Sequence, residues 1–278
     1  MPKRPDLITI TAAHREPRKA LGFSSNSMRT HSLFSMLLFA ATMMLVPGRS
    51  IAEEIRVAVA SNFADAMASI AMHFEASADH NVTLSFGSTG KHYAQIKNGA
   101  PFDAFFAADV RRPERLEKEG VALPGSRFTY AVGKLVLWSP EPGYVDPESS
   151  VLERHEFRHL AIANPKLAPY GKAAEEVLRA RGLWGRLSGR LVRGENIGQT
   201  FQFVKSGNAE LGFVAYSQVK RPNQPVAGSF WEAPQALYTP IEQQAVLLKD
   251  NEAARAFLAF VRSEGALKII HEYAYDTP

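Results

Sequence analysis

Residues 54–74 read EIRVAVASNFADAMASIAMHF, and this stretch decides the fold class. Its first seven residues alternate between apolar and other side chains, which is typical of a strand, and the alternation stops at the polar pair Ser61 and Asn62. Beyond that pair, apolar side chains recur at spacings of four, three and four, as on one face of a helix: Phe63, Met67, Ile70 and Phe74. The stretch predicts a strand, a polar turn and a helix in direct succession, with Ser61 or Asn62 as the helix N-cap.

The same succession recurs twice downstream. Residues 82–86 (VTLSF) predict a second strand, which ends at residues 87–90 (GSTG), where a second helix begins. Residues 102–108 predict a third strand, and residues 113–119 predict a third helix. Strands that alternate with helices are typical of α/β proteins, because a helical crossover joins parallel strands. We therefore expect an α/β fold with a mostly parallel sheet.

The pattern then restarts, which indicates a second lobe. Further strands are predicted at residues 134–138, 160–163, 210–215 and 243–248, and further helices at residues 172–180, 252–262 and 265–273. We expect two lobes, each a mostly parallel sheet flanked by helices: residues 53–132 plus 241–278 form lobe I, and residues 133–240 form lobe II. The hinge between them is expected near residues 130–134 and again before Gln243.

The first 52 residues are expected to be a leader. Residues 33–46 (LFSMLLFAATMMLV) form an uncharged run that is shorter than the ~20 residues of a typical membrane-spanning helix, and that suits the apolar core of a signal peptide. The small residues Ser50 and Ala52 predict cleavage after Ala52 and export to the periplasm. A membrane anchor or a core helix is the alternative. Because Met28 would open a leader of normal length, residues 1–27 are interpreted as an upstream extension.

The basic charge of the chain belongs to this leader. The whole sequence carries a net charge of +4 and has a pI of about 9.2, but seven of its 32 Lys and Arg and two of its 28 Asp and Glu lie in residues 1–52. The remaining 226 residues therefore carry a net charge of −1. The hypothesis of nucleic-acid binding rested on the basic charge of the whole chain, so it loses its main support. The chain has no cysteine, which excludes disulfides, Cys-ligated metal sites and a thiol nucleophile.

Two strand-to-helix turns carry the most informative chemistry. Ser61-Asn62 and Ser88-Thr89-Gly90 each end a predicted strand and open a predicted helix. Ligands of open parallel sheets gather at the carboxyl ends of the strands, and a helix N-terminus offers unpaired N–H groups. Two such turns could hold a small oxyanion without any Arg or Lys. Plain helix capping is the alternative for each turn.

Competing motifs are absent or incomplete. The sequence holds no dinucleotide-binding G-x-G-x-x-G and no nucleophile elbow G-x-S-x-G, and residues 87–91 only partly match a phosphate-binding P-loop. Three other candidate pairs remain open. His155 and His159 could share a helix face but lack a nearby third metal ligand. Asp103 and Asp109 are either paired carboxylates for acid–base work or strand-end caps and salt bridges. Lys91 and His92 are expected at the surface.

At several places the chain resembles the periplasmic molybdate-binding proteins of ABC importers, within the type II periplasmic substrate-binding protein family. The matching stretches are residues 57–66 (VAVASNFADA), 86–109 (FGSTGKHYAQIKNGAPFDAFFAAD), 123–139, 161–172, 195–199 and 211–216. The segment QIxxGAPxDxFxxAD within residues 95–109 is the most specific piece. The resemblance implies a two-lobed periplasmic binding fold with the ligand in the cleft between the lobes.

The resemblance also implies which residues bind the anion. It assigns Ser61 with Asn62 in the first turn, Thr89 with the adjacent Ser88 in the second, and Ile197 through its main-chain N–H. In the A-P-Y-G turn it favours Tyr170 as a phenol donor. Many members carry a tyrosine in the segment aligned with residues 212–215, but Ala215 stands there and Tyr216 follows, so Tyr216 is a doubtful ligand. No cofactor and no metal-cation site are implied.

The function that follows from the resemblance is capture of molybdate, and also of tungstate, by neutral hydroxyl and N–H donors. We expect a monomeric receptor that delivers the anion to the membrane permease and ATPase subunits of an ABC importer, without catalysis and without nucleic-acid partners. Two alternatives remain: a receptor for another small oxyanion or carboxylate, and a secreted α/β hydrolase. A hydrolase should show a nucleophile with a base, or a metal set, and the sequence shows neither.

Overall fold

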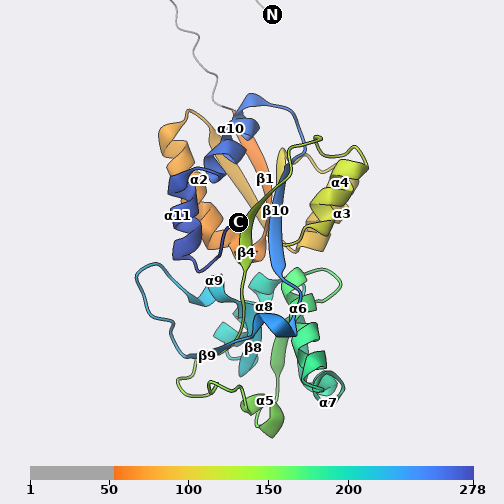
Figure 1. The fold of residues 1–278 in the computed structure, drawn as a ribbon, viewed down its shortest axis with the longest axis vertical. Coiled ribbons are helices and arrows are strands. Elements are labelled where there is room, and N and C mark those ends of the chain that lie inside the picture. The colour runs from red at the N-terminus through yellow and green to blue at the C-terminus, as the bar shows by residue number, and fades with distance from the viewer. Residues whose placement is uncertain (1–52) are drawn as a thin grey trace, which may run out of the picture. The chain divides into compact units, whose positions relative to one another are not determined.

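The computed structural model describes residues 53–278, which form two five-stranded sheets flanked by helices (Figure 1). The predicted leader and its cleavage after Ala52 lie outside the described residues. Within residues 53–278, no helix is long and apolar enough to cross a membrane.

The first sheet has the strand order β2-β1-β3-β10-β4. Its strands are β1 (Glu54–Ala60), β2 (Asn81–Gly87), β3 (Ala104–Ala107), β4 (Phe128–Gly133) and β10 (Ile241–Leu247). β1 pairs in parallel with β2 and β3, whereas β10 runs antiparallel to both β3 and β4. The carboxyl ends of β1, β2 and β3 therefore lie at one edge, where the predicted turns begin.

Helices cover both faces of this sheet. They are the 3-10 turn η2 (Ser61–Phe63), α2 (Ala64–Ser77), α3 (Thr89–Lys97), α4 (Arg111–Lys118), α10 (Glu252–Val261) and α11 (Glu264–Glu272). Successive side chains of a strand point to opposite faces. Val57 and Val59 accordingly pack into the core under α2, α10 and α11, whereas Ala58 packs into the core that holds Ile96 of α3 and Leu116 of α4. Figure 1 shows these two helical layers on opposite sides of the sheet.

The second sheet has the strand order β7-β6-β8-β5-β9. Its strands are β5 (Leu135–Ser139), β6 (Leu160–Ala163), β7 (Leu191–Gly194), β8 (Leu211–Ala215) and β9 (Ser229–Glu232). The helices and turns around it are α5 (Val151–Arg154), α6 (Pro169–Ala180), α7 (Trp184–Leu187), η3 (Ser188–Arg190), α8 (Ile197–Lys205), α9 (Tyr216–Val219) and η4 (Gln235–Leu237). Leu135 and Leu137 pack with α6, and the alternate residues Val136 and Trp138 pack with α8.

The α/β class and the two-lobed fold are confirmed, but both sheets are mixed rather than mostly parallel. β10 in the first sheet and β5 in the second each run antiparallel to both of their neighbours. The sequence pattern also missed β4, β7 and β9. These strands are partly exposed, and two of them are only four residues long, so they carry no clear alternation of apolar residues.

The chain passes from one sheet to the other twice, between β4 and β5 and again between η4 and β10. Gly133 ends β4 at the first passage, where a Cβ would overlap the hydroxyl of Tyr170, so only glycine fits. The C-terminal segment runs beside this passage. Asp276 forms an isolated bridge with Val132, and its carboxylate lies 2.9 Å from the Lys134 ammonium.

Candidate functional site

A small cavity lies where the two lobes meet, and all six residues predicted to bind a ligand line it. It contains about 180 Å³ of empty space, part of it open to solvent. The lining comprises Ser61, Asn62, Ser88, Thr89, Tyr170 and Ile197, together with Ala60, Gly87, Ala108, Ala168 and Pro169. The structure therefore brings together the starts of η2, α3, α6 and α8. No Lys, Arg, Asp or Glu from residues 53–278 lines this cavity.

Ser61 and Asn62 lie in η2, and neither caps a helix, so that prediction is wrong. The tight 3-10 turn directs both side chains away from the following helix. Ser61 Oγ accepts the N–H of Gly198 at 3.1 Å and donates to Asn196 Oδ1 at 3.1 Å, both at the start of α8. Asn62 Nδ2 donates to Gln243 Oε1 at 2.7 Å and to the Tyr275 hydroxyl at 2.9 Å. The side chains of the first turn therefore contact the other lobe and the interior.

The second turn behaves as the sequence predicts. Ser88 is the N-cap of α3, and its Oγ accepts the N–H of Lys91 at 3.3 Å. Thr89 Oγ1 accepts the N–H of Ala108 at 3.0 Å, which leaves the hydrogen of this buried hydroxyl available to donate. Gly90 N–H donates to Leu167 O of the other lobe at 2.8 Å, and a Cβ at Gly90 would lie only 2.9 Å from that oxygen. The close approach of the lobes here requires glycine.

Three helices point their N-termini at the cavity. Thr89, Tyr170 and Ile197 lie in the first turns of α3, α6 and α8, and within residues 53–278 their main-chain N–H groups have no acceptor. The aligned peptide dipoles place about half a positive elementary charge at each helix start. The cavity therefore has an anion-attracting field without an ionised side chain.

Tyr170 is buried, and its hydroxyl lies at the passage between the lobes. Gln243 Nε2 lies 3.5 Å from the hydroxyl oxygen, and burial raises the pKa of Tyr170 well above its ordinary value. The phenol expected to be a ligand donor is thus engaged near Gly133. The hydroxyl accepts this bond, and the main-chain N–H of Tyr170 is a second donor at the cavity.

Tyr216 does not line the cavity. It begins α9, stacks at a tilt against Phe230 with ring centroids 5.5 Å apart, and donates its N–H to Lys134 O. The buried phenols near the first turn come instead from Tyr130 and Tyr275. Tyr275 and Gln243 belong to no sequence motif, so no local pattern identifies them as part of this site.

The expected surface position of His92 is wrong. Its side chain is only 3% exposed, Nδ1 lies 3.1 Å from Gln95 Oε1, and Nε2 has no hydrogen-bond partner among the described residues. Burial lowers the pKa of His92, so the ring is neutral behind the second turn. Lys91 is exposed as expected, and its ammonium lies 3.0 Å from Glu195 Oε1 of the other lobe.

The remaining candidates have structural roles. His155 ends α5 with a φ of 59°, and His159 precedes β6, so the two share no helix face. In the described part of the chain, no three His, Cys, Asp or Glu side chains cluster as metal ligands would. Asp103 accepts the N–H of Arg56 at 2.7 Å and pairs with Lys249, while Asp109 pairs with Arg112. These carboxylates are strand-end caps and salt bridges.

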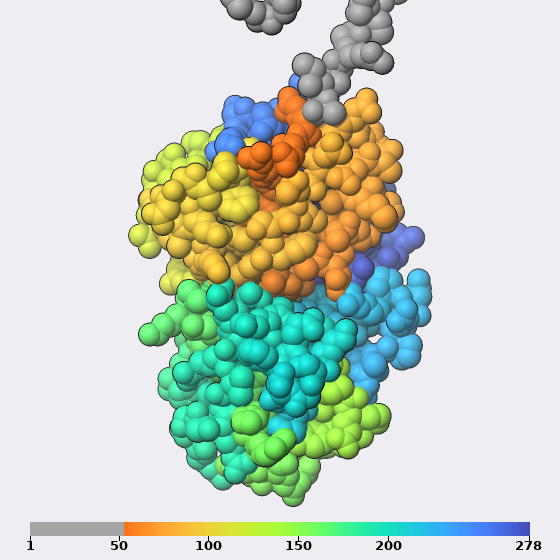
Figure 2. Space-filling view, turned by 180° about the vertical axis from the view of Figure 1, so that it is seen from behind, coloured from red at the N-terminus to blue at the C-terminus, as the bar shows by residue number. Residues whose placement is uncertain are grey.

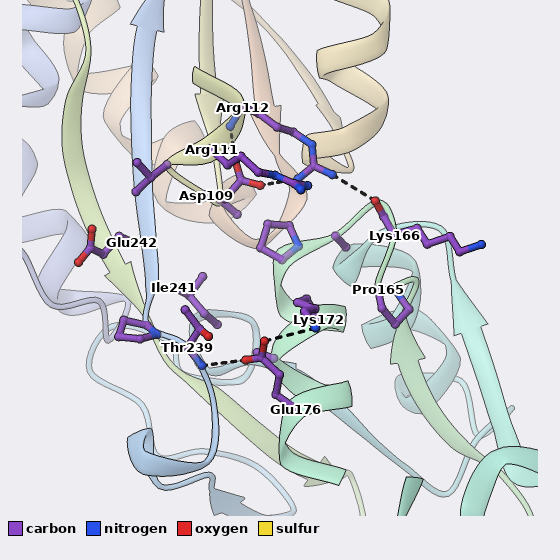
Figure 3. Close-up of a pocket in the computed structure, with 16 residues that line it drawn as sticks. Asp109, Arg111, Arg112, Pro165, Lys166, Lys172, Glu176, Thr239, Ile241 and Glu242 are labelled. Atoms are coloured by element: carbon purple, nitrogen blue, oxygen red, sulfur yellow. Dashed lines mark hydrogen bonds and ion pairs between the residues drawn. The ribbon is translucent and has the colours of Figure 1, made fainter. Parts of the chain in front are cut away.

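A larger pocket, with about 1530 Å³ of empty space that likewise includes open solvent, adjoins the small cavity and shares Ala108 and Ala168 with it. It lies between the start of α4, the start of α6 and the passage into β10 (Figure 3). Its charges largely neutralise one another. Arg112 binds Asp109 and donates to Lys166 O at 3.1 Å, and Glu176 pairs with Lys172 and accepts the N–H of Thr239. The two neighbouring spaces therefore differ in chemistry, because only the small one combines neutral donors with three helix starts.

The lobes are closed on each other. Besides the contacts of Ser61, Gly90 and Lys91, a salt bridge joins Arg221 to Asp65. Figure 2 shows the two lobes, orange to yellow above and green to blue below, meeting along their boundary on the back face. The cavity lies at this contact and remains partly open to solvent.

Comparisons with known proteins agree with this geometry. Residues 55–276 match the profile of the bacterial extracellular solute-binding proteins. The chain belongs to this family. Family membership makes it a solute-binding protein rather than an enzyme, which sets aside the hydrolase alternative.

Two relatives and one solved structure illustrate how similar this solute-binding protein is to characterised members. It is 53% identical to the molybdate-binding protein ModA of Azotobacter vinelandii over 227 residues, which is 81% of this chain and 90% of the relative. It is 47% identical to ModA of Rhodobacter capsulatus over 244 residues, which is 86% of this chain and 95% of the relative. The structure of the Azotobacter vinelandii periplasmic molybdate-binding protein superposes with a TM-score of 0.78 at 43% identity, covering 81% of this chain and 99% of that one.

Proposed function

We propose that this protein captures molybdate, and also tungstate, in the periplasm and delivers the anion to an ABC importer. One observation carries the proposal: neutral donors from four separate chain segments converge on one small cavity, and none of the described residues that line it is ionised. Support comes from relatives at 53% and 47% identity that are named molybdate-binding proteins.

The donors available suit a tetrahedral dianion. The hydroxyls of Ser88 and Thr89 and the N–H groups of Tyr170 and Ile197 are neutral donors at the cavity that have no acceptor among the described residues. The Ser61 hydroxyl donates to Asn196 Oδ1 in this structure, so it must turn toward the anion to bind it. A hydrogen bond to a charged acceptor contributes ~1.5–3 kcal/mol, and several such bonds together hold a small anion. Asn62 has a different part in this scheme, because its amide already donates to Gln243 and Tyr275.

Selectivity follows from the same donors. Molybdate is fully deprotonated at neutral pH and accepts from every donor. A monoprotonated phosphate would bring an O–H group that needs an acceptor, and the lining offers mainly donors. Sulfate is smaller and would leave some donors out of reach, whereas tungstate matches molybdate in size and charge. We therefore expect molybdate and tungstate to bind alike and the other two anions to bind weakly.

Export and delivery complete the proposal. Cleavage after Ala52 would release a monomeric receptor into the periplasm, where the closed lobes present the loaded state to the permease and its ATPase subunits. Mass spectrometry of the secreted protein tests the cleavage site, and an N-terminus other than Glu53 would contradict it. Light scattering with and without molybdate tests the monomer.

Thermal unfolding with each anion added separately tests the function. A ligand present at 100 times its Kd stabilises the folded protein by ~2.7 kcal/mol, so molybdate and tungstate should each raise Tm by several degrees. No rise with either anion would refute the proposal. A rise with sulfate or phosphate alone would favour the alternative of a receptor for another oxyanion.

A further inference from the structure

A buried cluster of hydroxyl and amide groups lies directly behind the first turn of the site. The Tyr275 hydroxyl donates to Asn62 O at 2.8 Å and accepts from Asn62 Nδ2 at 2.9 Å. Ser217 Oγ lies 3.0 Å from the same carbonyl oxygen and 2.8 Å from the Tyr275 hydroxyl, so its single hydrogen is shared between them. Asn62 is therefore held through both its main chain and its side chain.

These partners come from different lobes. Tyr275 follows α11 and packs in the core of the first lobe, with its ring 5.1 Å from that of Phe63. Ser217 lies in α9 of the second lobe, next to Tyr216, whose N–H donates to Lys134 O at the passage between the sheets. The contacts of Ser217 thus join the lobes at a residue that lines the ligand cavity.

We propose that Ser217 and Tyr275 form a closure latch that positions Asn62 and so slows ligand release. The proposal rests on the proposed function, because the latch acts on the same cavity. Rotation of the second lobe about the two passages withdraws Ser217 and leaves Tyr275 with Asn62. The first turn is then fully bonded only when the lobes are closed. Ser217 and Tyr275 are positioning residues, since they reach the ligand only through Asn62.

The cluster is suited to this role because it does not titrate. Burial raises the pKa of Tyr275 to about 12, so its hydroxyl keeps its hydrogen at neutral pH. Ser217 is 5% exposed and Asn62 is 4% exposed, so water does not compete for these bonds while the lobes are closed.

Stopped-flow kinetics of molybdate binding separate a latch from a merely structural contact. Ser217→Ala should raise the dissociation rate about fivefold, as expected for the loss of one buried hydrogen bond. Tyr275→Phe removes a hydroxyl that contacts both Asn62 and Ser217, so it should raise the rate at least as much. Both variants should leave the association rate within twofold. Because the two hydroxyls share a contact, the double variant should raise the dissociation rate by less than the product of the single effects.

Tyr130→Phe is the matched control. Tyr130 is buried like Tyr275 and also lies against Phe63, but its hydroxyl bonds Ala107 O at 3.2 Å and Gln243 Oε1 at 3.1 Å and has no hydrogen bond to Asn62 or Ser217 among the described residues. Tyr130→Phe therefore keeps the bond from Asn62 Nδ2 to Gln243 Oε1. This variant should lower Tm about as much as Tyr275→Phe while leaving the dissociation rate unchanged. Equal dissociation rates for the two phenylalanine variants, or no effect of Ser217→Ala, would overturn the latch.

A measurement without ligand distinguishes failure of the latch from failure of the proposed function. The chain has no cysteine, so Lys118→Cys and Arg186→Cys place one dye on an exposed position of each lobe. Energy transfer in the ligand-free protein should fall with Ser217→Ala and remain unchanged with Tyr130→Phe. If the parent protein binds no oxyanion but this shift occurs, the latch stands and the proposed function fails. If molybdate binds the parent protein, but Ser217→Ala changes neither the dissociation rate nor the energy transfer, the latch alone fails.

Discussion

The two turns of the cavity look alike in sequence and differ in structure. Ser88 and Thr89 are bonded within the first lobe, to Lys91 N and Ala108 N. Ser61 and Asn62 are bonded to α8 of the second lobe and to the buried cluster behind the passage. The side chains of the second turn are therefore held within their own lobe, and only the Gly90 N–H reaches the other lobe, whereas the Ser61 side chain of the first turn bonds across the lobes. Hydroxyl residues at two similar strand-to-helix turns can thus have different roles: one pair is held in place within its own lobe before the ligand binds, and Ser61 of the other pair helps to join the two lobes.

Removal of the Thr89 hydroxyl should have the largest effect. Thr89→Val deletes a donor and leaves the buried N–H of Ala108 without an acceptor. We expect affinity for molybdate to fall by about 30- to 100-fold, and the free energy of unfolding of the ligand-free protein to fall by ~1–3 kcal/mol. Isothermal titration and urea unfolding measure the two quantities. Unchanged ligand-free stability would show that the second turn is not locally preorganised.

Ser61→Ala should separate the two turns. Affinity should fall about tenfold, because a hydroxyl that can turn toward the anion is lost. Ligand-free stability should change by less than ~0.5 kcal/mol, because the lost contacts join the lobes rather than stabilise either core. The same titration and unfolding experiments apply. A loss of stability as large as that of Thr89→Val would remove the distinction between the turns.

Lys91→Ala should have a small effect on binding. The Lys91–Glu195 pair joins the lobes beside the cavity, but both side chains are about half exposed, and exposed pairs contribute ~0–1 kcal/mol. We expect Kd to change by less than threefold and to depend little on salt. If Lys91→Ala weakens binding more than Ser61→Ala or Thr89→Val, the anion is held by charge rather than by neutral donors.

The smallest effect concerns pH and the buried His92 behind the second turn. Burial lowers the pKa of His92 in the folded protein. In the unfolded chain the pKa of a histidine is about 6.5, so the folded state binds this proton less readily than the unfolded state does. This group contributes stability that is present above pH ~6.5 and is lost as the pH falls toward the depressed folded pKa. Unfolding between pH 7 and 5 should therefore be less pH-dependent in His92→Gln. Equal slopes for the two proteins would contradict the buried, neutral state.

Much of the fold could be predicted because its signals are local. The strand-to-helix successions at residues 54–74 and 82–97 appear where the periodicity predicts them, since buried faces impose a period of two in strands and 3.6 in helices. The strands β4, β7 and β9 and the antiparallel course of β5 and β10 carry no such signal. They depend on how the chain passes between the lobes.

The sequence by itself determined the α/β class and the two strand-to-helix turns with Ser61, Asn62, Ser88 and Thr89, because these depend on patterns within a few turns of chain. The resemblance to a known family, spread over nearly the whole mature chain, added Tyr170 and Ile197. Only the tertiary structure decided what those residues contact. Ser61 meets Asn196 across 135 positions, and Asn62 meets Tyr275 across 213. It also decided that the Tyr170 phenol lies at the passage while its N–H faces the cavity side. The physical reason is that hydrogen-bond partners are chosen by the packing of two lobes, and no local pattern specifies which distant groups that packing brings within 3 Å.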